Sequence, residues 1–477
     1  MDDNIKTYNR KSVKIGFVTL GLNTYWSQFT GLYERLLGYK NYILSLLNPD
    51  AIILDMGMID NTDKALEETE KLKGVDLMVF YVSTYCVSST LIPFLTVIKV
   101  PYLVLNLQPS SVIDFAKVNA MQDKGKATGE WLAYCQACAI PEITYVLKRS
   151  GLQYHIITGH LQDPKVREQL SIWTSAAQVA IALRNSHIGI LGNYYNGMLD
   201  IYSDIRGLSL TFGSHFDLIE ICEVKKLRNA LTNTEIEKEL TELRIVLDIS
   251  PQCDTDEINR VVRTLAAIRK LSVLHSLGGL AYYYDGAGDH ECLDIITSMI
   301  AGSTIMTGSG IPIAGECDIK NVIAMKIMAL MGGGGSFSEF YCLDFEKDEV
   351  LLGHDGPAHP MVSNTGVSLV PLPVYHGKPG KGLSIQMSVR HGDVTLLSVC
   401  EDDKGVFLHY AEGESVEGEI LNIGNTNSRY RFKCGARDFI NLWSMAGTSH
   451  HCTIGIGHKG ATIEALASLL SIRAIKI

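Results

Sequence analysis

The sequence has no excess of positive charge, because 42 Lys and Arg residues are outnumbered by 52 Asp and Glu residues, giving a formal net charge of −10. A nucleic-acid-binding surface needs a basic patch, so we expect no nucleic-acid partner. The chain also lacks an uninterrupted apolar run of the roughly 18 residues that a transmembrane helix requires. Residues 1–14 are polar and contain no apolar core of a secretory leader. These absences predict a soluble cytoplasmic protein without a membrane partner.

A disulfide framework is also missing. The eleven cysteines are scattered, and their odd number favours reduced thiols. Only Cys135 and Cys138 have the C-x-x-C spacing, and no second pair follows that could complete a zinc site. We interpret the two thiols as small packing residues, with a redox pair as the less favoured alternative.

The first part of the chain alternates short apolar runs with helical patterns, which predicts a parallel sheet covered by helices. The expected strands are 13–20, 51–56, 76–83 and 101–107, with a helix near 28–46. Such sheets bind small ligands beyond the carboxyl ends of their strands. No G-x-G-x-x-G follows the first expected strand, which argues against dinucleotide binding.

A second α/β unit is expected to begin near residue 186, with a strand at 187–193. Its first long helix, 234–247, has an expected capping box in Thr234 and Glu237. The next helix is expected to start behind Asp254 and Thr255 and has one apolar face. Both helices are expected to face a core.

The pattern changes after Gly332. Residues 380–410 alternate apolar and polar side chains, with turns at 391–393 and 402–405, which predicts antiparallel hairpins. We therefore predict an α/β protein with two N-terminal Rossmann-like domains, 1–180 and 181–325, and a C-terminal β-barrel-like domain, 326–477.

Two carboxylates, Glu316 and Glu339, lie beside glycine-rich turns among apolar residues. An ionised carboxylate is costly to bury unpaired, and a divalent cation would neutralise both. His450 and His451 follow near the C-terminus and offer imidazole ligands. Carboxylate and imidazole ligands together suit Mn, Fe, Co or Zn better than a thiolate-preferring metal.

Four short segments, in one order, carry a resemblance to a known family: I-A-G-E-C-D-I-K-N, G-G-S-F-S-E-F-Y, V-L-L-G-H and A-G-T-S-H-H. They resemble the G-E-G-D-W-K, F-M-E-D-Y, L-G-S-H and A-G-G-A-H-H segments of L-arabinose isomerases and their fucose-isomerase relatives. Residues 158–163, T-G-H-L-Q-D, are similar to the family's T-G-H-W-Q-D. The matching pieces run in order from about residue 76 to the C-terminus.

The resemblance implies a metal-dependent aldose–ketose isomerase that acts on a free pentose or deoxyhexose through an enediol. It aligns Glu316, Glu339, His354 and His451 with the ligands of a divalent cation, Mn²⁺ or otherwise Co²⁺ or Mg²⁺. It also makes the two glutamates the proton-transferring carboxylates. His359 is the alternative to His354, because the intervening segment is two residues shorter than in the arabinose enzymes.

His450 is expected to bind substrate rather than metal, because neighbouring residues of an extended segment point to opposite faces. Polar and aromatic residues at the first domain's strand ends are expected to bind sugar as a lid over a neighbouring chain's site, as the resemblance implies. We therefore expect a homo-oligomer, a trimer or hexamer. The expected sugar-binding residues of this domain are Tyr25, Trp26, Gln28, Tyr85 and Cys138.

Two departures from the family concern the sugar. Cys138 stands where the family has a substrate-contacting histidine, although Glu142 matches the family's acid four residues later. The G-L-N-T-Y-W stretch is closer to the fucose-isomerase relatives. We therefore expect poor handling of L-arabinose.

Alternatives stay open at this point. The same residues would serve a sugar epimerase, and a non-catalytic sugar-binding protein could keep the scaffold. Each residue alone also has an ordinary explanation: Glu316 could open a helix at 319–330, His354 could lie in a surface loop, and His450 and His451 could be core residues.

Overall fold

The computed structural model describes residues 12–285, 290–372 and 382–477, in two compact units that divide at residues 181 and 182. Most of the polar segment 1–14, and residues 380 and 381 of the expected hairpin region, lie outside the described residues. No helix in the described ranges is both long enough and apolar enough to cross a membrane. All eleven cysteines are free thiols, as expected.

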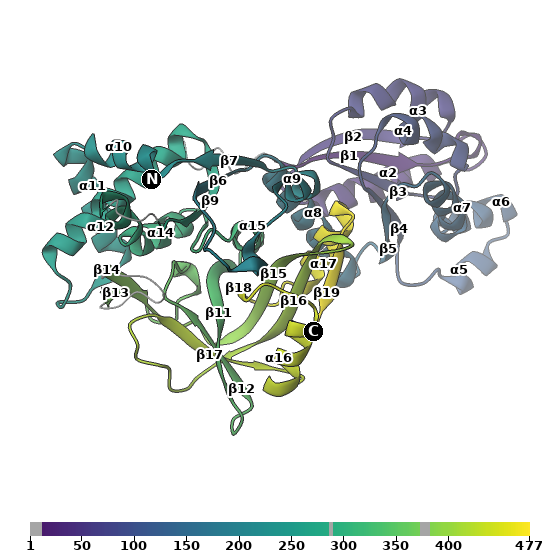
Figure 1. The fold of residues 1–477 in the computed structure, drawn as a ribbon. Helices are drawn as coiled ribbons and strands as arrows, with labels where there is room; N and C mark the ends of the chain where they lie inside the picture. The colour runs from purple at the N-terminus through teal and green to yellow at the C-terminus, as the bar shows by residue number, and fades with distance from the viewer. Residues whose placement is uncertain (1–11, 286–289, 373–381) are drawn as a thin grey trace. The chain divides into compact units, whose positions relative to one another are not determined.

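The first unit, residues 12–181, is built on a five-stranded parallel sheet (Figure 1). Its strands, in spatial order, are β2 (Ile52–Ile59), β1 (Lys14–Leu20), β3 (Leu77–Val82), β4 (Tyr102–Gln108) and β5 (Tyr154–His160). Every residue of the central strand β3 is buried, which explains its continuous apolar run. The parallel sheet predicted for this region is confirmed.

Helices of the first unit bury their apolar faces in two clusters. Ile140, Ile143 and Leu147 of α7 (Gln136–Arg149) pack with Phe80 of β3. A second cluster joins α2 (Leu32–Leu46) to Met58 of β2 and to Leu132 at the end of α6 (Lys124–Leu132).

The second unit contains a four-stranded parallel sheet in the order β10 (Ile313–Ala314), β9 (Leu277–Tyr283), β6 (His187–Gly192) and β7 (His215–Ile219). Helix α12 (Thr255–Leu274) is capped by Asp254, whose side chain accepts a hydrogen bond from the Asp256 N–H. Helix α11 (Asn233–Val246) starts earlier than predicted, and its capping box is formed by Thr232 and Glu235. The predicted pair Thr234 and Glu237 is wrong, because two Thr-x-x-Glu matches overlap there and the earlier one lies at the true helix start.

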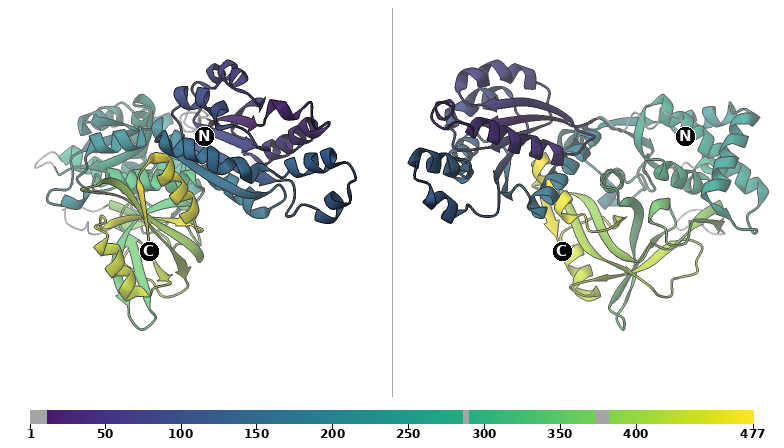
Figure 2. Two further views of the ribbon diagram at one scale, coloured as in Figure 1. Left: turned by 90° about the vertical axis from the view of Figure 1, so that its right-hand side faces the viewer. Right: turned by 180° about the vertical axis from the view of Figure 1, so that it is seen from behind.

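A closed six-stranded antiparallel barrel forms the C-terminal part of this unit. Its strands follow the order β15, β18, β11, β12, β17 and β16, and pairing between β16 and β15 closes the ring. Figure 2 shows these strands, coloured green to yellow, curving around one another. The bounds are β11 (Gly334–Asp344), β12 (Glu349–His354), β15 (Gly392–Asp402), β16 (Gly405–Val416), β17 (Thr426–Phe432) and β18 (His451–Ile456). The predicted barrel-like fold is confirmed.

One predicted hairpin of this region is wrong. The turn at 402–405 joins β15 to β16 as expected. The strand before 391–393, β14 (Gly382–Gln386), pairs instead with β13 (Ser368–Leu372), in a three-stranded sheet with β8 (Asp248–Ile249). Alternation of apolar residues predicts a half-buried strand but does not identify the strand beside it.

Candidate metal centre

Barrel strands bring one glutamate and two histidines together. Glu339 of β11 lies directly opposite His451 of β18, and on its other side it faces Gly353, the neighbour of His354 in β12. Residues directly opposite in an antiparallel pair have Cβ atoms about 4.5–5.5 Å apart. One ligand atom from each of Glu339, His354 and His451 lies within 4.8 Å of the others.

Glu316 reaches the same place from the loop between β10 and α15 (Ile319–Leu330). Glu316 and Cys317 have φ angles of 56° and 63°, so two successive residues other than glycine occupy the left-handed region. Such strain persists only where the surrounding structure imposes it, and it clusters at functional sites. Helix α15 is capped by Asp318, which accepts a hydrogen bond from the backbone N–H of Asn321. The helix therefore does not need Glu316 as its cap.

Three histidines surround the Glu316 carboxylate. Its Oε2 lies 3.2 Å from His451 Nε2 and 3.6 Å from His450 Nε2. Its Oε1 lies 4.0 Å from His354 Nε2. Glu316, His450 and His451 form a second group with ligand atoms within 4.8 Å of one another, and His451 belongs to both groups. The structure thus gathers Glu316, Glu339, His354 and His451.

Buried polar atoms in this cluster lack hydrogen bonds. Among the described residues, Glu316 Oε2, His354 Nε2 and His451 Nε2 have no hydrogen-bond partner. The 3.2 Å contact between His451 and Glu316 is thus close but not aligned as a hydrogen bond. A buried, unsatisfied polar atom costs about 1–3 kcal/mol, and a charged one costs more. Convergent carboxylate and imidazole atoms of this kind fit a divalent cation.

His451 is held from behind. Its Nδ1 lies 3.0 Å from Asp318 Oδ2, and both side chains are almost fully buried. A carboxylate on one ring nitrogen orients the imidazole and leaves the other nitrogen for a metal. The ring of Phe337 packs against His451 and His354, with centroid separations of 4.4 and 4.3 Å.

His354 is buried at the end of β12, so a surface-loop position is wrong. Its Nδ1 accepts a hydrogen bond from the Gly356 N–H at 2.8 Å, which places the proton of a neutral ring on Nε2. For Nε2 to bind a cation, the proton must move to Nδ1, which then gives up the hydrogen bond from Gly356 and faces Asp355 Oδ1 at 3.4 Å. His359 instead uses its Nδ1 to accept from the Met361 N–H at 3.1 Å, and it belongs to neither ligand group found in the described ranges.

His450 departs from the expectation that it points away from His451. The two ring centroids are 3.8 Å apart, and both Nε2 atoms face Glu316. The alternation rule fails here because β18 begins only at His451, so His450 precedes the regular strand. The structure therefore places His450 at the centre.

Charge within the cluster shifts several pKa values. Burial opposes ionisation of Glu316, but His450 and His451 outweigh it and hold the pKa of Glu316 well below its usual range. Burial lowers the pKa of His451, but Asp318 and Glu316 overcome it and raise this pKa above its ordinary value. Burial dominates at His354 and lowers its pKa. A proton on His451 thus supplies the positive charge that a cation would otherwise supply.

The other predicted sugar-binding residues all belong to the first unit. Trp26 donates its indole N–H to Asp60 Oδ2 at 2.6 Å, and Tyr85 donates its hydroxyl to Glu142 Oε2 at 3.1 Å. Tyr25, Trp26 and Tyr85 are half-buried against the cluster around Leu32 and Leu36. Cys138 is exposed in the first turn of α7. The polar tips of Trp26 and Tyr85 therefore already have partners.

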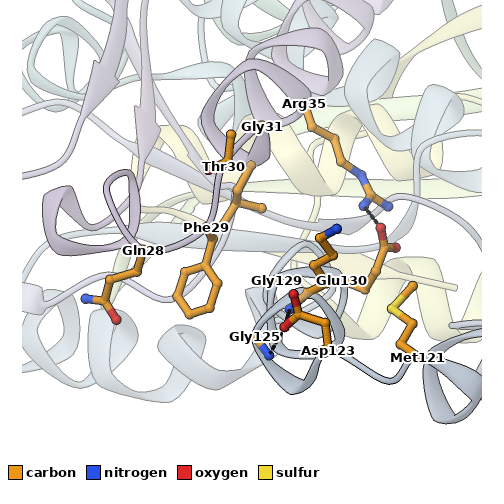
Figure 3. Close-up of a pocket in the computed structure, with 12 residues that line it drawn as sticks. Gln28, Phe29, Thr30, Gly31, Arg35, Met121, Asp123, Gly125, Gly129 and Glu130 are labelled. Atoms are coloured by element: carbon orange, nitrogen blue, oxygen red, sulfur yellow. Dashed lines mark hydrogen bonds and ion pairs between the residues drawn. The ribbon is translucent and has the colours of Figure 1, made fainter.

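Gln28 lines a cavity of about 560 Å³ between the start of α2 and α6 (Figure 3). Its amide donates to the Thr24 carbonyl at 2.8 Å. Arg35 and Glu130 form an ion pair of 2.9 Å in the cavity wall. None of the other predicted sugar-binding residues lines this cavity.

Several residues of the centre were not singled out from the sequence. Asp318 stands within the G-E-C-D segment, where its spacing from Glu316 could have identified it. Tyr195 and Tyr283 line a cavity of about 50 Å³ together with Glu316 and His354. Asp200 accepts from His450, 250 residues away, and no local pattern indicates that contact.

No family model matches the chain. Among curated proteins it is similar to the L-arabinose isomerase of Geobacillus thermodenitrificans (strain NG80-2), with 21% identity over 346 residues, 70% of this chain and 69% of that enzyme. The L-arabinose isomerase of Bifidobacterium longum (strain DJO10A) is 20% identical over 344 residues, 67% of this chain and 65% of that enzyme. The Bacillus subtilis (strain 168) L-arabinose isomerase is 21% identical over 351 residues, 70% of this chain and 69% of that enzyme. These three matches support an arabinose-isomerase-like family.

Proposed function

We propose that this protein is a sugar isomerase that interconverts an aldose and a ketose in a metal-dependent reaction. The observation that carries the proposal is the convergence of Glu316, Glu339, His354 and His451, with three buried ligand atoms lacking hydrogen bonds. The similarity to L-arabinose isomerases supports the sugar class.

An aldose–ketose interconversion moves one proton between C1 and C2 and another between their oxygens. A bound divalent cation, with Mn²⁺ as the preferred ion, would stabilise negative charge that develops on the sugar oxygens. Glu316, Glu339, His354 and His451 would hold it. Glu316 is ionised at neutral pH and can accept a proton; its lowered pKa makes it a weaker base than an ordinary glutamate and suits binding of a cation.

Glu316 and Glu339 approach the centre from different elements, a loop and a barrel strand. Two carboxylates carried by separate structural elements can contact one substrate from different directions. We assign the carbon-bound proton to one of them and the oxygen-bound proton to the other, through an enediol. The closed barrel and the capped helix α15 fix their positions in advance.

The sugar and the assembly are also part of the proposal. We infer a pentose or deoxyhexose substrate, with poor turnover of L-arabinose, because Cys138 stands where the resembled family has a histidine. A homo-oligomer in which the first unit supplies Tyr25, Trp26, Gln28, Tyr85 and Cys138 to a neighbouring chain's centre follows from the family resemblance. A purified protein that is monomeric and still isomerises sugars would contradict this assembly.

The decisive test compares Glu316→Gln and Glu339→Gln with the wild type on aldopentoses, 6-deoxyaldohexoses and aldohexoses, with Mn²⁺ and with chelator. The amide keeps the shape but cannot accept the proton, so each variant should lose about 10²–10⁴ in rate. Glu414→Gln, at an exposed position of β16, is the matched control and should stay at wild-type rate. Losses within about tenfold for both catalytic variants would contradict proton transfer by these residues.

Deuterated water identifies the reaction. Incorporation of deuterium at C1 or C2 of a ketose product supports isomerisation. Exchange only at another carbon would instead indicate an epimerase on the same centre, and no exchange with any sugar would leave a binding protein.

A further inference from the structure

Asp200 makes an unusual set of contacts within the second unit. It lies in a short 3-10 turn, Leu199–Ile201, in the segment after β6. Its Oδ2 accepts from three donors: the His450 N–H at 2.9 Å, the Ser449 hydroxyl at 3.1 Å and His450 Nδ1 at 2.6 Å. One carboxylate oxygen therefore fixes both the backbone and the ring of His450.

The turn that carries Asp200 is itself anchored. The Asp200 carbonyl accepts from Lys320 Nζ at 2.7 Å, and Lys320 is a buried residue of α15. Asp318 caps this same helix and holds His451. Helix α15 thus supports both histidines, one through Asp318 directly and one through Lys320 and Asp200.

The two aspartate–histidine pairs differ in exposure. The side chains of His451 and Asp318 are 0% and 1% exposed, whereas those of His450 and Asp200 are 36% and 38% exposed. Both pairs place the carboxylate on Nδ1 and aim Nε2 at Glu316. The buried pair suits a permanent ligand, and the exposed pair suits contact with a molecule that enters and leaves.

Resting on the isomerase function proposed above, we propose that Asp200 is a positioning residue that holds His450 with its Nδ1 protonated and its Nε2 facing the sugar oxygens. An imidazole whose Nδ1 proton is held by a carboxylate has one tautomer and one orientation. Its Nε2 is then held facing the Glu316 carboxylate, where it can form a hydrogen bond with a sugar hydroxyl that enters the centre. Without Asp200 no hydrogen bond would hold Nδ1, and only the contacts with Glu316 and the His451 ring would restrain the half-exposed imidazole.

The test measures Asp200→Asn, Asp200→Ser, His450→Ala and the Asp200→Asn/His450→Ala double variant. Outer-sphere partners of this kind typically contribute about 10–100-fold. Asp200→Asn and Asp200→Ser should lower kcat by that factor, with KM and bound Mn²⁺ unchanged. The double variant should be no slower than His450→Ala alone, because Asp200 acts only through that ring.

Asp204→Asn is the matched control from the same segment, because Asp204 is exposed and its side chain pairs with the exposed Arg206. It should change kcat by less than about twofold, as surface substitutions usually do. A measurement independent of turnover uses ¹⁵N-histidine: the His450 Nδ1–H signal of the wild type should be lost in Asp200→Asn and kept in Asp204→Asn.

Three results would overturn the positioning role. The first is a wild-type kcat in Asp200→Asn. The second is a kcat loss in the double variant equal to the combined losses of the two single variants. The third is a fall in bound Mn²⁺ in His450→Ala as large as that in His451→Ala, which would make His450 a metal ligand. A wild type that isomerises no aldose would instead remove the proposed function itself, and the ¹⁵N signal would still report whether Asp200 orients the ring.

Discussion

Polar side chains are treated differently in the two compact units. In the first unit, Trp26 and Tyr85 at the ends of parallel strands have their donors engaged by Asp60 and Glu142. In the second unit, Glu316 Oε2, His354 Nε2 and His451 Nε2 are buried without hydrogen bonds. Satisfied polar groups stabilise a fold, whereas unsatisfied convergent ones are retained where a ligand completes them. The first unit also has buried atoms without a hydrogen bond, such as Thr19 Oγ1 and the Tyr81 hydroxyl, but among the described residues the convergent carboxylate and imidazole groups lie in the second unit. We therefore propose the second unit as the place of the chemistry.

The largest expected effect is on the amount of bound Mn²⁺, which should fall in variants of the second unit and not in a variant of the first. Glu316→Ala and His451→Ala should each reduce bound Mn²⁺ by more than about tenfold after dialysis, since each removes a ligand. Trp26→Phe, in the first unit, should retain the wild-type amount. Metal analysis of the purified proteins decides this, and full occupancy in both centre variants would refute the site.

Glycine substitutions sharpen the contrast on stability. Gly335 is the second residue of β11, the strand that carries Glu339. Its φ is +110°, and a Cβ there would lie 2.7 Å from the Met325 carbonyl oxygen. Gly335→Ala should lower the free energy of unfolding by about 2–4 kcal/mol and weaken Mn²⁺ binding. Gly57 of β2 has a φ of +67° and open space around it, so Gly57→Ala should cost only about 1 kcal/mol. A denaturation midpoint that falls further in Gly57→Ala than in Gly335→Ala would contradict this prediction.

A pH series tests the charge balance at His451. Its raised pKa means that pairing with Asp318 and Glu316 stabilises the metal-free protein fully below about pH 6.5, the usual histidine value. That stabilisation declines as the pH rises toward the raised pKa. Cation binding requires a neutral imidazole and strengthens over the same range.

The difference in Tm between Mn²⁺-loaded and chelator-treated protein should therefore widen from pH 6.5 to pH 8.5. In His451→Asn, which lacks the titrating ring, the difference should be small and flat. If the Tm difference of the wild type becomes smaller as the pH rises, the pH dependence assigned to His451 is wrong.

The smallest effect concerns the first unit alone. Tyr85→Phe removes one hydrogen bond to Glu142, which still accepts from the Ser88 N–H at 2.7 Å. Stability should fall by about 1 kcal/mol with bound Mn²⁺ unchanged. If Tyr85 also contacts sugar, the KM should rise several-fold with kcat preserved, and an unchanged KM would remove Tyr85 from the substrate-binding set.

Much of the fold follows from patterns that are local in sequence. The buried run of β3 and the cap Asp254 of α12 identify their elements directly. Strand partners are not local: β14 joins β13 rather than β15, and alternation contains no information about that choice. The overlapping Thr-x-x-Glu matches before α11 show the same limit at a single helix end.

The centre divides in the same way. Glu316, Glu339, His354 and His451 are predictable because their segments resemble a family motif. The orientation of His450 is not, because it depends on where β18 begins and on Asp200, which approaches from 250 residues away. Only the folded chain brings these together.

The pairing of Glu339 with His451 and Gly353 has a consequence for how this protein tolerates length changes. Side chains alternate across a strand, so deleting one residue inside β11 or β18 would turn Glu339 or His451 to the opposite face of the barrel wall. Residues added between strands leave that alternation intact. Length changes in the loops of this chain should therefore leave the centre intact, whereas a one-residue deletion inside β11, β12 or β18 should disrupt it.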